Sequence, residues 1–125
     1  MQKQTSLLLG AISGGLAVAI GAFGAHALKP FLMETGREAT FELAVRYQFY
    51  HALALVATGI LTSETSRKAL HYSALCFILG IIFFSGSLYV LCFTGIKMLG
   101  AVTPFGGVFF ILGWILLGVG VYKKI

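Results

Sequence analysis

Two histidines within apolar stretches are the residues of this chain whose type and position could do chemistry. His26 follows a run of small residues, and His51 lies inside the sequence YQFYHALAL. Imidazoles from neighbouring helices can hold haem, copper or zinc, so His26 and His51 are the candidate metal or haem ligands. His51 also fits a second interpretation, in which it is a neutral, hydrogen-bonded side chain of the interior. Both interpretations stay open.

Other polar side chains accompany the histidines and complete the candidate ligand-binding or partner-binding site. Tyr47 and His51 are four residues apart, as are Ser85 and Tyr89, so each pair shares one face of a helix. No nucleophile has an adjacent base at a recognisable spacing, so we expect no catalytic residue and a protein that is not an enzyme. The full candidate set is His26, Arg46, Tyr47, His51, Ser85, Tyr89 and Thr103.

The composition determines which elements must position these residues. The chain is 58% hydrophobic and only 10% charged, too few charges to cover a soluble globule of 125 residues. Four apolar segments are each long enough, at about 1.5 Å per residue, to cross a hydrocarbon core of roughly 30 Å. They span residues 5–28, 40–62, 69–94 and 104–122. The sequence therefore predicts an all-α, four-helix transmembrane bundle that forms a single domain over residues 1–125.

The basic residues are scattered at the ends of these segments, which argues against a nucleic-acid partner and indicates a topology signal. With four spans both termini share one side of the membrane. That side carries Lys3, Arg67, Lys68, Lys123 and Lys124, and the other carries Lys29, Arg37, Arg46 and Lys97. Five cations against four place both termini in the cytoplasm by the positive-inside rule.

The first segment combines a packing surface with a sequence that imitates a cleavage site. Residues 25–27 have the A-x-A form of a signal-peptide site, but the preceding apolar run exceeds a normal signal core, so we expect an uncleaved helix. Small residues recur at a spacing of four, which lets helix backbones approach closely, within the chain or between copies of it. These helix-packing residues are Gly10, Gly14, Ser13, Ala17, Gly21 and Ala25.

Local signals predict where the other helices begin and end. Thr35 and Glu38 match a capping box, which predicts a helix that starts near Gly36. Ser66 is the expected N-cap of the third helix, and Gly95 its expected end. Thr103 followed by Pro104 predicts the start of the fourth helix, with Thr103 as its N-cap. Glu42 and Arg46 have the favourable order for an ion pair along a helix.

Threading the segments alternately across the membrane brings the candidate residues of all four helices to the outer half. The inner half is almost wholly apolar, which argues against a conducting channel. We therefore expect this polar cluster to bind a partner helix, a lipid or a small ligand, in a homo-oligomer or a larger membrane complex. A haem-binding or metal-binding redox accessory protein that uses His26 and His51 is one alternative, and a small transporter is another. No particular cofactor is predicted.

Four sequence segments also resemble the successive signatures of a known family. GAFGAHALK, YQFYHALAL, GSLY and TPFGG occur in this order along the chain. They resemble the domain-of-unknown-function 423 family of YgdD-like small membrane proteins, which has a human relative. The resemblance implies a four-helix integral protein of the bacterial plasma membrane. It implies no activity, and it carries no catalytic role to any residue.

Overall fold

The computed structural model describes residues 1–63 and 68–122, and within these ranges all regular structure is helical. The elements in chain order are α1 (Lys3–Ala25), α2 (Lys29–Thr35), α3 (Glu38–Leu61), α4 (Lys68–Gly80), the π-helix η1 (Ile81–Gly86), α5 (Ser87–Thr94), the 3₁₀-helix η2 (Lys97–Ala101) and α6 (Thr103–Tyr122). The all-α fold predicted from the sequence is therefore confirmed. The predicted N-cap Ser66 lies outside the described residues.

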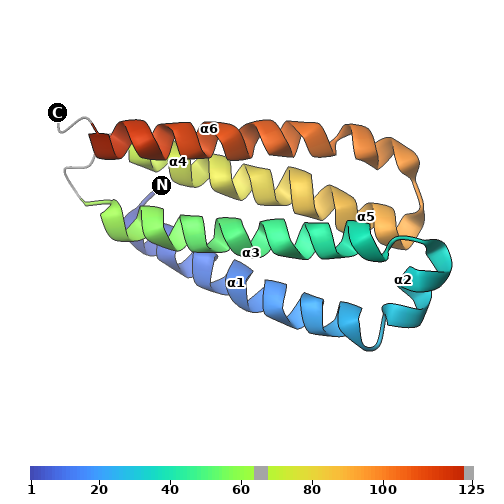
Figure 1. The fold of residues 1–125 in the computed structure, drawn as a ribbon. Coiled ribbons are helices and arrows are strands. Elements are labelled where there is room, and N and C mark those ends of the chain that lie inside the picture. Colours follow the sequence, from blue (N-terminus) through green and yellow to red (C-terminus); the bar gives the residue numbers. More distant parts are fainter. Residues whose placement is uncertain (64–67, 123–125) are drawn as a thin grey trace.

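The long helices lie side by side, and α2 closes one end of the bundle (Figure 1). α1 packs chiefly on α3, and α6 packs on α4 and η1. α3 also contacts α4, η1 and α5, so it joins the two helix pairs. α1 begins and α6 ends at the same end of the bundle, opposite α2. α3 is therefore the central element around which the others are arranged.

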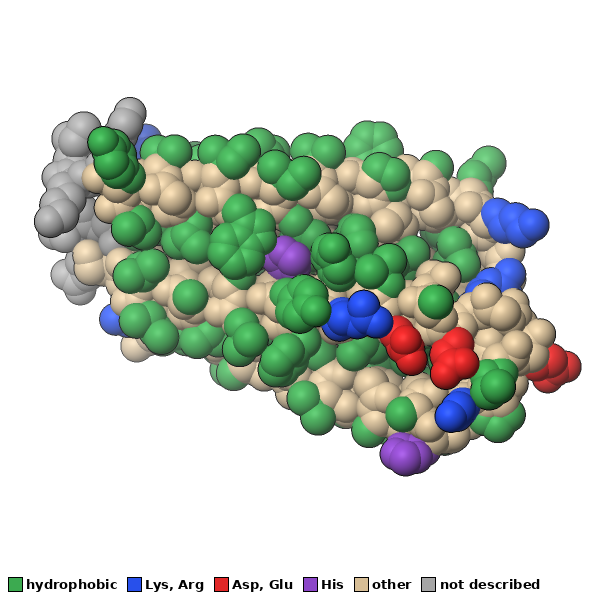
Figure 2. Space-filling view, viewed as in Figure 1, with side chains coloured by type: hydrophobic (Ala, Val, Ile, Leu, Met, Phe, Trp, Pro, Cys, Tyr) green, Lys and Arg blue, Asp and Glu red, His purple; other side chains and the backbone are tan. Residues whose placement is uncertain are grey.

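The outer surface of the bundle is apolar along most of its length. Three helical stretches are long and apolar enough to cross a membrane: Lys3–Ala25, Lys68–Thr94 and Lys97–Tyr122. α3 has 24 residues but is less apolar, because it carries Arg46, Gln48 and His51. Hydrophobic side chains cover the helices in Figure 2, and charged side chains gather at the α2 end. Such a surface is stable only where lipid replaces water as the solvent.

The junction between α1 and α3 contains the separate short helix α2, which the sequence analysis does not predict. α2 ends at Thr35, and Gly36 adopts a left-handed conformation with φ 70°. The Arg37 N–H donates to the Leu32 carbonyl at 2.9 Å, which closes this helix end. The predicted capping box is therefore wrong: the Thr35 hydroxyl donates back to the Phe31 carbonyl at 2.9 Å. The predicted helix end at Gly95 is confirmed, with φ 72°.

Small residues bring α1 close to α3. A Cβ added to Gly10 would lie 3.0 Å from the Ala52 carbonyl oxygen, and one added to Gly14 would lie 3.7 Å from the Ala52 Cβ. Ala17 is buried in the same seam. Two more of the predicted packing residues also line it, since Gly21 lies against Val45 and the Ser13 carbonyl accepts a hydrogen bond from α3.

The last position of the predicted packing series differs in the structure. Ala25 is exposed, whereas the neighbouring Gly24 is buried under the ring of Phe41. The exact four-residue spacing of the series does not hold at this end, because α1 stops at Ala25 and its last turn leads into the α1–α2 junction. Gly24 thus makes room there for the Phe41 ring of α3.

A similar contact joins α6 to the π-helix η1, and it generates a matched pair of substitutions. A Cβ added to Gly106 would overlap the backbone of Phe83 and Phe84, whereas a Cβ added to Gly107 would meet nothing within 4 Å. We predict that Gly106→Ala lowers the free energy of unfolding by about 1–3 kcal/mol, because backbone atoms cannot yield without moving η1. Gly107→Ala is expected to be neutral or to stabilise by up to about 1 kcal/mol through helix propensity. Equilibrium unfolding in mixed micelles measures both, and equal effects of the two substitutions would contradict the packing seen here.

Candidate functional site

His51 lies in the interior with both ring nitrogens engaged. Its Nδ1 is 2.7 Å from the Tyr47 carbonyl oxygen, and the Trp114 indole N–H donates to its Nε2 at 3.1 Å. Because an indole N–H can only donate, Nε2 accepts and Nδ1 carries the proton of a neutral ring. The imidazole stacks on Phe110 with a centroid separation of 3.5 Å. A metal ion or a haem iron at Nε2 would have to displace the indole of Trp114.

Gln48 links three helices and is a site residue that the sequence analysis did not single out. Its side-chain N–H donates to the Ser13 carbonyl of α1 at 2.9 Å, and its carbonyl oxygen accepts from the Tyr89 hydroxyl of α5 at 2.6 Å. Gln48 is only 5% exposed. The signal that could have found it is its position, since a polar amide between Tyr47 and His51 in an apolar segment requires partners.

Serine hydroxyls make further hydrogen bonds between helices. The Ser85 hydroxyl, on η1, donates to the Ala44 carbonyl of α3 at 2.7 Å. Ser73 of α4 donates in the same way to the Gly113 carbonyl of α6, also at 2.7 Å. α6 begins one residue before the predicted first position, so Thr103 is its first residue and not its N-cap, and the Thr103 hydroxyl lies 2.7 Å from the Ser87 hydroxyl of α5. These hydroxyls use otherwise unpaired lone pairs on helical carbonyls.

The candidate residues therefore do not line one cavity. Tyr47 and His51 line a pocket between α3 and α6, and Ser85 and Tyr89 line a groove between α1 and the stretch formed by α4, η1 and α5. His26 is exposed at the end of α1. Among the described residues no group of three or more His, Cys, Asp or Glu side chains could hold a metal ion. The sequence predicts that these side chains lie together in one half of the bundle, but the packing of the helices distributes them over separate surfaces.

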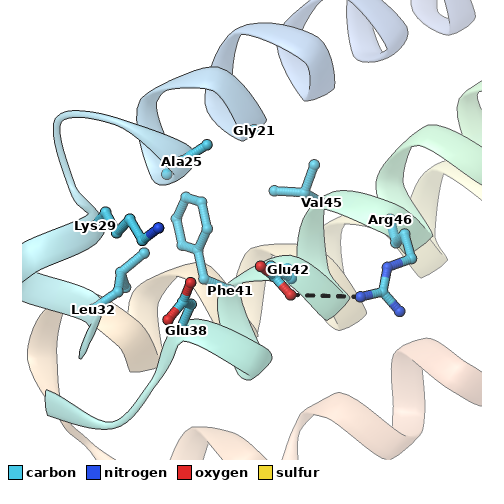
Figure 3. Close-up of a pocket in the computed structure, with 10 residues that line it drawn as sticks. Gly21, Ala25, Lys29, Leu32, Glu38, Phe41, Glu42, Val45 and Arg46 are labelled. Atoms are coloured by element: carbon cyan, nitrogen blue, oxygen red, sulfur yellow. Dashed lines mark ion pairs between the residues drawn. The ribbon is translucent and has the colours of Figure 1, made fainter.

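Arg46 belongs to a different site, a pocket of about 340 Å³ at the corner where α1, α2 and α3 meet (Figure 3). We call this site the charged pocket, because four charged side chains of both signs line it: Lys29 from α2 and Glu38, Glu42 and Arg46 from α3. Its other lining residues are Gly21, Gly24, Ala25, Leu32, Phe41 and Val45. The charged pocket therefore combines a small, apolar floor with a charged rim.

The charges of the rim are only loosely paired within the part of the chain that the structure describes. Glu42 and Arg46 form an ion pair at 3.7 Å, as the sequence predicts, but both side chains are 57% exposed. Exposed helical pairs of this kind contribute only about 0.3–0.5 kcal/mol, so a ligand could replace the pair at little cost. Lys29 and Glu38 face the same pocket (Figure 3), and neither has an ion-pair partner within the described ranges of the chain. The rim can therefore offer two cations and two carboxylates to a ligand.

Two glycines of α1 create the space below this rim. A Cβ added to Gly21 would lie 3.2 Å from Val45, and one added to Gly24 would overlap the ring of Phe41. The ring of Phe41 consequently lies against Gly24 and forms an apolar part of the pocket lining (Figure 3). Chemically, the arrangement can bind a charged group at the rim and an apolar chain beside it.

The hydrogen bonds of Gln48 can be tested with a double-mutant cycle. We predict that Gln48→Met and Tyr89→Phe each lower the free energy of unfolding by about 0.6–1.7 kcal/mol, because each leaves a buried partner unpaired in an apolar setting. The two effects should be non-additive by at least about 0.5 kcal/mol, since the residues share one hydrogen bond. Tyr72→Phe, at an exposed tyrosine of α4, is the control and should be neutral. Additive effects would show that the Tyr89 hydroxyl does not bond to Gln48.

Comparison with known proteins places the chain among membrane proteins without an assigned activity. Residues 20–107 match a family described as a protein of unknown function (DUF423). The UPF0382 membrane protein SSP2132 of Staphylococcus saprophyticus is 46% identical over 94% of this chain and 96% of its own length. The UPF0382 membrane protein YwdK of Bacillus subtilis is 41% identical over 94% of this chain and 95% of its own length. No solved structure matches.

These matches confirm the resemblance seen in the sequence. Bacterial relatives named as membrane proteins agree with the three apolar helical stretches, so the predicted location in a bacterial membrane, with several spans, is confirmed. Neither the family description nor the names of these relatives states an enzymatic activity. The chain belongs to the DUF423 family of membrane proteins.

Proposed function

We propose that this protein is a non-enzymatic bundle of four membrane spans that binds the headgroup of a membrane lipid in the charged pocket. The observation that carries the proposal is the charged pocket itself, where a charged rim lies directly beside an apolar floor at the end of the bundle. The four spans are α1, α3, the continuous stretch Lys68–Thr94, and α6 with η2. In this arrangement α3 is also a membrane span, in which Gln48, His51 and Thr58 are buried against the other helices while Glu42 and Arg46 are exposed.

The topology that we propose places both termini in the cytoplasm and α2 on the outer side. Supporting this orientation, α1 begins and α6 ends at the same end of the bundle (Figure 1), and that side has the larger number of basic residues in the sequence. A helix of 24 residues extends about 36 Å, enough for α3 to cross as well.

Cysteine labelling in intact cells tests this orientation. In a Cys76→Ala, Cys92→Ala background, we expect Met33→Cys to react with a membrane-impermeant thiol reagent, because Met33 is 59% exposed on α2. Gln2→Cys should react only after the membrane is permeabilised. Labelling of Gln2→Cys but not of Met33→Cys in intact cells would invert the proposed orientation.

The position of the charged pocket suits a lipid headgroup. On the face drawn in Figure 2 most charged side chains lie at the α2 end, and they extend from there toward the middle of the bundle. Arg46 lies two turns inside the start of α3, where a long side chain can reach the headgroup layer while its carbons contact apolar groups. A phosphate beside Arg46 would accept charge-assisted hydrogen bonds at that level.

Lipid retention measured by native mass spectrometry tests the proposed function. We predict that Lys29→Gln combined with Arg46→Gln lowers the occupancy of co-purified phospholipid by about tenfold, because both cations of the charged pocket are removed. Lys97→Gln is the matched control, since Lys97 is an exposed cation at the same end of the bundle but does not line the charged pocket. Equal retention by the wild type and the double variant would contradict lipid binding at this pocket.

A further inference from the structure

We propose that the charged pocket selects a ligand that carries both a phosphate and a primary ammonium group, as in a phosphoethanolamine headgroup. This inference rests on the proposed lipid-binding function and specifies the chemistry of the same site. It starts from the presence of carboxylates as well as cations at the rim: Glu38 and Glu42 face the pocket together with Lys29 and Arg46 (Figure 3).

A purely anionic headgroup fits the rim poorly, because the rim carries two carboxylates as well as two cations. Two cations attract a phosphate, but Glu38 and Glu42 would face the same anion, and like charges brought together are unfavourable. A ligand with one positive and one negative group can pair with both kinds of side chain. The Glu42–Arg46 pair, weak at 3.7 Å and largely exposed, can open to supply one partner to each end of such a ligand.

The order of the charges along α3 matches the order of groups in a phosphoethanolamine lipid. Glu38, Glu42 and Arg46 follow one another at intervals of four residues, from the end of the bundle toward its middle. Successive positions therefore lie about 6 Å apart along the helix axis. The phosphate of a membrane lipid lies nearer the glycerol and acyl chains, and the ammonium lies two carbons further out. Arg46 is thus placed for the phosphate, and Glu38 and Glu42 are placed for the ammonium.

The lining residues distinguish a primary ammonium from a quaternary one. A primary ammonium has three N–H donors and can bond to both carboxylates at once, whereas a trimethylammonium group has none. Sites that bind quaternary ammonium typically surround it with several aromatic rings. Phe41 is the only aromatic side chain among the residues that line this pocket, and its ring lies against α1. The pocket therefore favours ethanolamine over choline.

Competition between lipids in nanodiscs tests this selectivity. We expect the wild-type protein to bind phosphatidylethanolamine about tenfold more tightly than phosphatidylcholine or phosphatidylglycerol, through the added ammonium contacts. Glu38→Gln combined with Glu42→Gln should abolish the preference for phosphatidylethanolamine over phosphatidylglycerol. Glu34→Gln is the matched control, because Glu34 is an exposed carboxylate on α2 that does not line the pocket. Thermal unfolding of each variant confirms that it is folded.

The possible failures of the two proposals can be told apart. Tighter binding of phosphatidylglycerol than of phosphatidylethanolamine, lost in the Lys29→Gln, Arg46→Gln variant, would overturn the selectivity and keep the lipid-binding function. Binding of none of the three lipids in a manner that depends on Arg46 would overturn both. Calorimetry with soluble phosphoethanolamine identifies the source of the headgroup: binding as tight as that of the lipid would make the ligand a free solute, and weaker binding supports the lipid.

Discussion

The close approach of α1 to α3 is the constraint on which most of the structure depends. Gly10, Gly14 and Ala17 bring the two helices together without large side chains between them. Only at this separation can the side chain of Gln48 reach the backbone carbonyl of Ser13. The same seam widens at Gly21 and Gly24 into the charged pocket. Packing, hydrogen bonding and the candidate binding site are therefore three results of one helix contact.

Lipid as solvent explains why the buried polar groups are used as they are. Apolar side chains gain little by leaving lipid for the protein interior, so helix association depends on close packing and on hydrogen bonds between helices. Ser73, Ser85 and Gln48 each bond to a backbone carbonyl of another helix. The Trp114 indole N–H donates to the His51 side chain and so joins α6 to α3. In other proteins such polar residues can serve as ligands. In this bundle they connect one helix to the next.

Much of the fold could be predicted from the sequence, because short sequence patterns determine where the helices lie and where they end. Long apolar runs give the positions of the helices, and Gly95 ends one of them where a left-handed residue is needed. The spacing of Glu42 and Arg46 predicts their ion pair. The short helix α2 was missed, because Thr35 and Glu38 satisfy the pattern of a capping box while Gly36 permits a helix end between them.

The candidate site was harder to predict, because it depends on how each helix is rotated about its axis. Apolar segments determine the level of a residue along the bundle but not the neighbour that it faces. The sequence makes both His26 and His51 candidate ligands, although His26 is exposed and His51 is stacked on Phe110 with Trp114 edge-on to it. Neither Lys29 nor Glu38 carries a binding signal in the sequence, and they become part of a site because α2 lies beside α3 in the fold.

The π-helix η1 has a consequence for how such a protein can change in evolution. A π turn contains about one residue more than an α turn, so it rotates everything after it by about 100° relative to a continuous α-helix. Tyr89 follows η1 and faces Gln48, whereas α4 before it packs on α6. A single inserted residue can thus set the face that α5 presents without altering the face that α4 presents. The two halves of this span are therefore independent in register, and each can acquire new contacts while the other keeps the bundle together.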